Sequence, residues 1–144
     1  MHHARLLLLC LALAGCAAAP PPHLFVPAVG DSGLTAILAA HPLPAGGNIS
    51  ALPLQSTEAA SYHLIQVRDH ELPHVHATHD LAVTVLRGTG RLFIRGEPHD
   101  MRPGDVAVVP RATPHYFVNS GAEPAVAFVT FAPPYDGTDQ VPTQ

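Results

Sequence analysis

Three histidines have the residue type and the spacing of a metal site. His74 and His76 flank a single valine in the run H-V-H, and His115 follows much later in the chain. Side chains alternate faces along a strand, so His74 and His76 point the same way if this run is extended. A third histidine on another strand would complete a three-nitrogen site. We therefore predict one divalent metal ion held by His74, His76 and His115, with zinc, iron, manganese, nickel and copper all left open.

The net negative charge of the chain argues against a nucleic-acid partner. The chain has seven basic side chains, all of them arginine, against eleven acidic ones, a net charge of −4 with histidine neutral. Removal of an N-terminal leader that contains Arg5 would leave six against eleven, or −5 (6 − 11). No basic patch remains, so nucleic acid is not an expected partner. The 144 residues fit a single domain.

The N-terminus has the features of an export leader. Arg5 precedes the apolar run Leu6–Leu13, which is too short to span a membrane, and small residues follow. The sequence L-A-G-C at residues 13–16 resembles the bacterial lipobox. This resemblance implies cleavage before Cys16, lipidation of its thiol, and an envelope protein that faces the periplasm, with the outer membrane favoured over the inner. The alternative is an ordinary signal peptide cut near Ala17–Ala19.

The remaining sequence predicts an all-β domain. Short apolar segments alternate with turn signals from about residue 61 onward, which is typical of a barrel or sandwich. An apolar run ending before Pro42 predicts one short helix, capped by Asp31 or Ser32. Residues 44–56 look like a loop. The predicted organisation is a signal peptide (1–15), a lipidated cysteine with a proline-rich tether (16–22), an N-terminal extension (23–60), a barrel (61–134) and a loose tail (135–144).

Two motifs resemble those of small bacterial cupins. The first pairs two histidines one residue apart with a later glycine, and the second places a Pro-x-Gly-Asp turn before a proline, a histidine and an asparagine. The matching residues are His74, His76 and Gly88 for the first motif, and Pro103, Gly104, Asp105, Pro110, His115 and Asn119 for the second. Joint matches are more specific than either motif alone. The resemblance implies a double-stranded β-barrel (a jelly roll) holding one divalent metal near its open mouth, and a possible homodimer.

The sequence departs from the cupin pattern at two positions. Leu81 stands where the family has a glutamate ligand, and Ala112 stands where it has a glycine. The second change matters only if that turn needs a positive φ. The missing glutamate leaves three neutral ligands, which makes a stronger Lewis acid of the ion. Water, substrate, His79 or Asp80 could take the fourth position, and Asp80 could instead orient a ligand imidazole.

Two functions from different classes fit these residues. One is a metal-dependent enzyme acting on a small molecule, with dioxygenase-like or isomerase-like chemistry and no general base beyond His79 or Asp80. The other is an envelope lipoprotein that binds a metal or a small ligand without turnover. For the histidines His63, His70 and His99, surface or hairpin positions are expected and no role is assigned.

Overall fold

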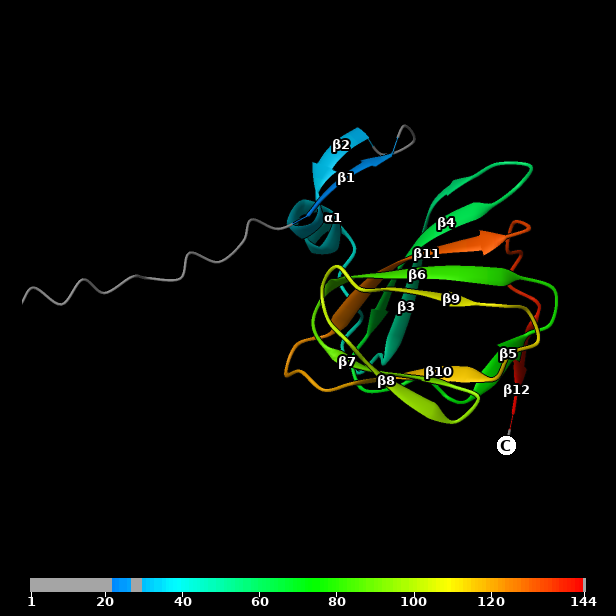
Figure 1. The fold of residues 1–144 in the computed structure, drawn as a ribbon. Coiled ribbons are helices and arrows are strands. Elements are labelled where there is room, and N and C mark those ends of the chain that lie inside the picture. Colours follow the sequence, from blue (N-terminus) through cyan, green and yellow to red (C-terminus); the bar gives the residue numbers. More distant parts are fainter. Residues whose placement is uncertain (1–21, 27–29, 144) are drawn as a thin grey trace, which may run out of the picture.

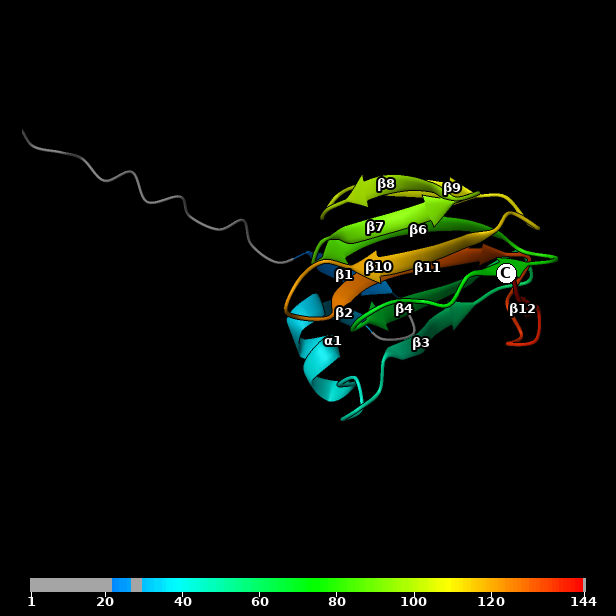
Figure 2. The same ribbon diagram turned by 90° about the horizontal axis from the view of Figure 1, so that it is seen from below.

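Two antiparallel five-stranded sheets face each other in the structure, a computed structural model that describes residues 22–26 and 30–143 (Figures 1 and 2). The leader and Cys16 lie outside these residues. The first sheet, here called the β4 sheet, has the order β3 (Ile49–Ser56), β4 (Ser61–Val67), β11 (Ala125–Ala132), β6 (Asp80–Arg87) and β9 (Val106–Val109). The second, the β5 sheet, has the order β12 (Gln140–Pro142), β5 (His74–His76), β10 (His115–Asn119), β7 (Gly90–Ile94) and β8 (Glu97–Met101). The predicted all-β barrel is confirmed.

The interior of the barrel is filled by side chains from both sheets. Strand alternation sends Ile65 inward on β4, while Leu64 next to it points outward. The inner cluster draws on both sheets and comprises Leu81, Val85, Leu92, Met101, Val109, Val129 and Phe131. This apolar packing forms the walls of the cavity described below.

A second apolar cluster covers the outer face of the β4 sheet. The hairpin β1 (His23–Val26) and β2 (Gly30–Gly33) leads into helix α1 (Leu34–Ala40), which packs against β3, β4 and β11. The helix buries Leu34, Ile37 and Leu38, one face at helical spacing. The predicted helix is confirmed, but its cap is Gly33 rather than Asp31 or Ser32, because residues 30–33 are extended and paired with β1.

Two segments that the sequence placed outside the barrel are strands within it. Residues 49–56, predicted as loop, form β3, which pairs with β4 along its length. Proline is found at sheet edges and at bulges, and Pro53 has both settings, since β3 is an edge strand and its register with β4 shifts between Pro53 and Gln55. The tail predicted as loose contains β12, whose Val141 pairs with Val75 on β5. The tail is therefore fixed beside the strand that carries two of the predicted ligands.

The turn before β10 explains one departure from the cupin pattern. Ala112 has φ 58°, so this turn does need the left-handed region, and alanine occupies it at a cost of about 1 kcal/mol relative to glycine. The Ala112 N–H donates to the His76 carbonyl at 2.7 Å. That bond holds the turn against β5. The strained turn thus ties the two metal-motif segments together.

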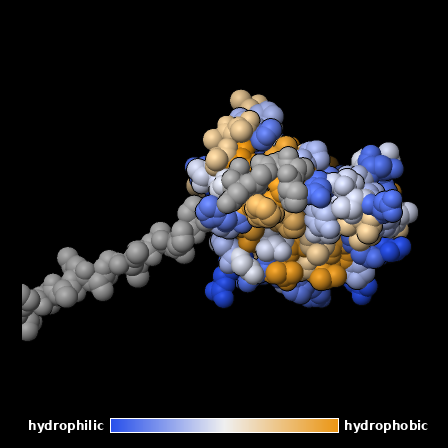
Figure 3. Space-filling view, turned by 90° about the horizontal axis from the view of Figure 1, so that it is seen from above, coloured by the Kyte–Doolittle hydropathy of each residue, from blue (hydrophilic) through white to orange (hydrophobic). Residues whose placement is uncertain are grey.

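The face of the molecule seen in Figure 3 has both polar and apolar side chains. Val106 and Val108 on edge strand β9 are 63% and 66% exposed. In the β5 sheet, the edge strand β8 has Glu97, Pro98 and Asp100 exposed, and charged residues and proline at an edge discourage strand pairing with other chains. Within the described ranges, no helix has the length and apolar character needed to cross a membrane.

Candidate metal centre and cavity

The structure brings the three predicted histidines together at one end of the barrel. His74 and His76 share a face of β5, and His115, the first residue of β10, pairs directly with His74. The ring centroids of His74 and His115 are 4.4 Å apart, and those of His76 and His115 are 5.6 Å apart. One ligand atom from each ring lies within 4.8 Å of the other two. Strand alternation and register alone therefore produce a three-nitrogen cluster.

Each of these rings is oriented by a partner on its Nδ1 atom. The Nδ1 of His74 lies 2.7 Å from the Leu72 carbonyl, and that of His115 lies 2.9 Å from the Thr113 carbonyl. The Nδ1 of His76 lies 2.9 Å from Oδ1 of Asp139. These oxygens accept, so each Nδ1 carries the proton and each Nε2 keeps its lone pair. Outer partners of this kind fix the tautomer of metal-ligating histidines.

Burial favours the uncharged form of two of the three rings, His76 and His115, at neutral pH. The three histidines are only 4–5% exposed. Desolvation lowers the pKa of His115 from 6.5 to about 4, against the opposing hydrogen bond to Thr113. Desolvation also lowers the pKa of His76, with the Asp139 hydrogen bond opposing it. Neutral imidazoles are the form that binds a metal, so at neutral pH these two rings bind without first losing a proton.

The histidines border an internal cavity of about 180 Å³. Its walls come from both sheets and are mainly apolar, including Ile65, Val83, Val85, Leu92, Met101 and Phe117. The polar groups are few and lie with the histidines: Glu71, Tyr135 and Gln140. A space of this size holds a small organic molecule or several waters. A largely apolar chamber with a few polar groups beside a histidine cluster that could hold a metal has the character of a small-ligand site.

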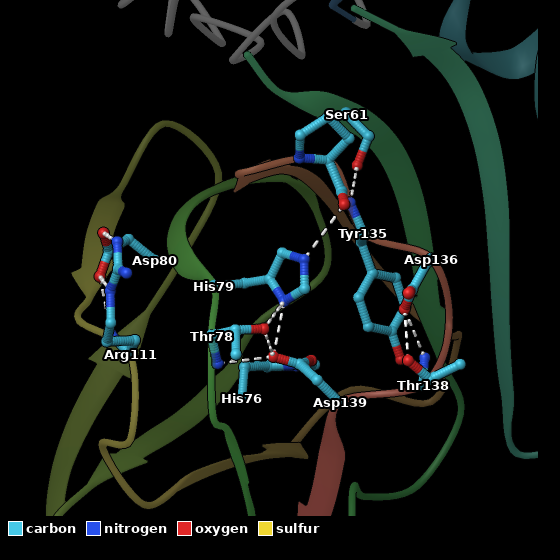
Figure 4. Close-up of polar contacts among 11 residues, drawn as sticks. Ser61, His76, Thr78, His79, Asp80, Arg111, Tyr135, Asp136, Thr138 and Asp139 are labelled. Atoms are coloured by element: carbon cyan, nitrogen blue, oxygen red, sulfur yellow. Dashed lines mark hydrogen bonds and ion pairs between the residues drawn. The ribbon is translucent and has the colours of Figure 1, made fainter. Parts of the chain in front are cut away.

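Neither predicted substitute for the missing glutamate reaches the cluster. Asp80 forms an ion pair with Arg111, with Oδ2 2.6 Å from Nη2, and Figure 4 shows this pair apart from His76. Both ring nitrogens of His79 are occupied, Nδ1 by Asp139 at 2.6 Å and Nε2 by the Pro134 carbonyl at 3.1 Å. Leu81 itself is buried and lines the cavity. Among the described residues, neither Asp80 nor His79 therefore replaces the missing glutamate, and an ion held by the three histidines would take water or a ligand as its fourth partner.

Asp139 is the group that orients His76, a role the sequence left open to Asp80. Its carboxylate lies between His76, Thr78 and His79 (Figure 4). Burial would raise the pKa of Asp139, but the hydrogen bonds from His76, His79 and Thr78 outweigh it and hold the pKa well below its usual value. Sixty-three residues separate Asp139 from His76. No local motif joins them, so sequence reasoning had no pattern to find.

Glu71 is a second functional candidate that sequence reasoning missed. Its side chain lines the cavity together with His74. Its Oε2 accepts from the Phe117 N–H at 2.9 Å, and its own N–H donates to the Phe117 carbonyl at 2.8 Å. Burial raises the pKa of Glu71, although His74 and the Phe117 N–H oppose the rise. A cavity carboxyl with a raised pKa is suited to proton transfer near neutral pH.

Three further histidines, His63, His70 and His99, and the motif residue Asn119 lie outside the cluster. His63, expected at the surface, is buried at 8% exposure, because alternation along β4 turns it inward against Phe131. His70 and His99 are exposed, as predicted. Asn119 donates to the carbonyls of Arg68 and Glu123 at 2.7 and 2.9 Å, so it fastens a turn and takes no part in the cluster.

Comparison with known proteins gives the family. Residues 61–131 match the model of the cupin domain. An uncharacterized protein of Aquifex aeolicus is 39% identical over 93 residues, which cover 65% of this chain and 76% of the relative. The region matched by the domain model includes all three clustered histidines.

Solved structures share the architecture. KdgF from Halomonas sp. is similar with a TM-score of 0.58 and 25% identity, covering 62% of this chain and 82% of that one. Pac13 from Streptomyces, described as a nucleoside dehydratase, is similar with a TM-score of 0.60 and 17% identity, covering 67% of this chain and 79% of Pac13. At that identity the Pac13 likeness concerns the fold. With the motif residues, the two facing sheets and the domain match in agreement, the chain belongs to the cupin family.

Proposed function

We propose that this protein is a metal-dependent enzyme that moves a proton within a small molecule, an isomerase-like reaction. The observation that carries the proposal is the set of three buried histidines that line one cavity. Each has its Nδ1 in a hydrogen bond, which leaves Nε2 available to a metal. The donor set fits a divalent ion such as zinc. Glu71 in the same cavity favours proton transfer over simple ligand storage, because storage needs no acid–base group there.

The residues divide the chemistry between them. A divalent ion held by the three histidines would act as a Lewis acid toward a ligand carbonyl. Glu71 takes a proton from the hydroxyl-bearing carbon next to that carbonyl and returns it to the former carbonyl carbon. The hydroxyl proton passes to the former carbonyl oxygen, so a hydroxy-aldehyde becomes a hydroxy-ketone without a co-substrate. The apolar walls exclude water and strengthen electrostatic interactions inside the cavity.

Metal analysis of the purified protein tests the first part of the proposal. Wild type is expected to bind about one equivalent of zinc per chain, and His76→Ala, with only two imidazoles left, at least roughly 100-fold more weakly because a ligand is lost. His99→Ala is the matched control, because His99 is exposed on β8 and should leave zinc binding unchanged. A wild-type protein that takes up no stoichiometric zinc, iron, manganese, nickel or copper would refute the metal site.

We also propose that the chain is a lipoprotein of the cell envelope, anchored through Cys16. The support is the lipobox-like run L-A-G-C at residues 13–16, followed by small residues and three prolines. Expression of wild type and Cys16→Ser in a Gram-negative bacterium, followed by membrane fractionation, tests this anchor. Wild type is expected in the membrane fraction and the variant outside it. Equal membrane retention of the two would contradict lipidation.

A further inference from the structure

The C-terminal segment lies directly against the strand that carries two of the three clustered histidines. Strand β12 lies beside β5, with Gln140 opposite His76 and Pro142 opposite His74. Backbone bonds extend this contact beyond the strand, since Ala77 donates to the Asp139 carbonyl at 3.3 Å and Thr143 donates to the Pro73 carbonyl at 2.9 Å. The tail is therefore hydrogen-bonded at both ends of β5, the strand that carries His74 and His76.

One carboxylate of the tail, that of Asp139, contacts the cluster residue His76 and the two residues Thr78 and His79 that follow β5. Asp139 accepts from Nδ1 of His76 at 2.9 Å, and its second oxygen accepts from the N–H and the hydroxyl of Thr78, both at 2.8 Å. That second oxygen also lies 2.6 Å from Nδ1 of His79. The Asp139 side chain is only 10% exposed. A nearly buried carboxylate with four donors holds one geometry, and it transmits that geometry to His76.

Aromatic packing supports the same segment. The Tyr135 ring stacks on Phe131 with centroids 4.7 Å apart, and its edge-to-face contacts with His76 and His79 are both at 5.4 Å. The Tyr135 N–H donates to the Ser61 hydroxyl at 2.9 Å. Tyr135 and Gln140 also line the cavity. The tail therefore contributes both to the orientation of a ligand histidine and to the shape of the chamber.

We infer that Asp139 is a positioning residue for the metal, and that metal binding and docking of the C-terminal strand stabilise one another. This inference rests on the proposed metal site. Asp139 holds the His76 ring with Nε2 toward the cluster, so loss of the carboxylate frees the ring to rotate. Linkage then requires the reverse effect: a bound metal, by fixing His76, strengthens the hold of His76 on Asp139 and of β5 on β12.

Zinc competition titrations test the forward effect. Asp139→Ala is expected to weaken zinc binding by about 10–100-fold, the usual effect of removing an outer partner of a metal ligand. Asp136→Ala is the matched control, because Asp136 lies in the same segment but accepts locally from Thr138 at 2.9 and 2.6 Å. The control should bind zinc as wild type does. If Asp139→Ala fails to fold, the zinc affinity of Asp139→Asn is measured in its place. Asparagine keeps the side-chain volume but offers His76 and Thr78 one acceptor oxygen instead of two, so it too should bind zinc more weakly than wild type.

Amide hydrogen exchange tests the reverse effect. In wild type, zinc should slow exchange at Ala77 and Thr143, whose amides bind across the β5–tail contact. In Asp139→Ala the protection added by zinc should disappear. A purely structural role for Asp139 predicts a different pattern, in which zinc does not slow exchange at these amides even in wild type. Zinc affinity equal to wild type in the Asp139 variants, with tail exchange indifferent to zinc, would overturn the inference and leave the metal site intact. A wild-type protein that binds no zinc would overturn both.

Discussion

Replacement of Glu71 by glutamine is expected to lower kcat by roughly 10²–10⁴-fold, the range for loss of a positioned acid–base group. The glutamine side chain keeps an oxygen that accepts from the Phe117 N–H, so the β10 contact survives while the ionisable group is lost. The assay follows hydroxy-aldehydes and hydroxy-ketones small enough for the 180 Å³ cavity by proton NMR in D2O, where proton transfer also introduces deuterium. Zinc binding should remain at the wild-type level.

The stability of Glu71→Gln separates catalysis from folding. Burial raises the pKa of Glu71, so the folded protein is stabilised by the protonated carboxyl and loses stability as pH rises above about 4.5, the ordinary value. The neutral amide of glutamine does not titrate and avoids this loss. The free energy of unfolding of the variant at pH 7 should therefore equal or exceed that of wild type. A kcat within about tenfold of wild type would assign Glu71 to the Phe117 contact alone. Absence of turnover by wild type with every carbonyl compound tested would favour a ligand-binding protein.

Replacement of Leu81 by glutamate is expected to make stability depend strongly on metal. Leu81 is buried, lines the cavity and stands where other cupins have a carboxylate ligand. Without metal, a buried carboxyl there should cost about 2–4 kcal/mol of unfolding free energy at pH 7. With saturating zinc the carboxylate should act as a fourth ligand. Each tenfold gain in zinc affinity then adds about 1.4 kcal/mol to the free energy of unfolding. Urea unfolding with EDTA and with zinc measures both states.

Leu81→Gln provides the matched comparison for this experiment. Glutamine has the same length and shape as glutamate but no charge, and it is a weaker zinc ligand. Both variants should be destabilised in EDTA, while only the glutamate variant should bind zinc at least about tenfold more tightly than wild type. Equal zinc affinity in the two variants would mean that a carboxyl at position 81 does not reach the cluster. The three-histidine site would then be closed on that side by the packing of β6.

Local patterns in the sequence were sufficient for the strands of the barrel core and for the three clustered histidines. The alternation in β4 and β11 and the turn at Pro103–Asp105 act over a few residues, where side-chain direction is set by the backbone itself. The H-V-H run needed only an extended chain to place two imidazoles on one face. Helix α1 was likewise encoded by its own apolar spacing. Its cap was not, because pairing with β1 decided the conformation of residues 30–33.

The edge strands and the supporting groups of the site depended on partners distant in the chain. Strand β3 contains a proline and little alternation, and it is a strand because β4 offers it a ladder. The tail is ordered for the same reason, beside β5. Asp139 reaches His76 through the pairing of the tail with β5, whereas Glu71 is held in the cavity by its hydrogen bonds with Phe117 on β10. No sequence pattern predicts either contact. The sequence by itself determined which residues can ligate a metal, since residue type and strand period are local properties. Only the tertiary structure decided which groups orient those ligands and which carboxyl shares their cavity, because those contacts join strands distant in the sequence.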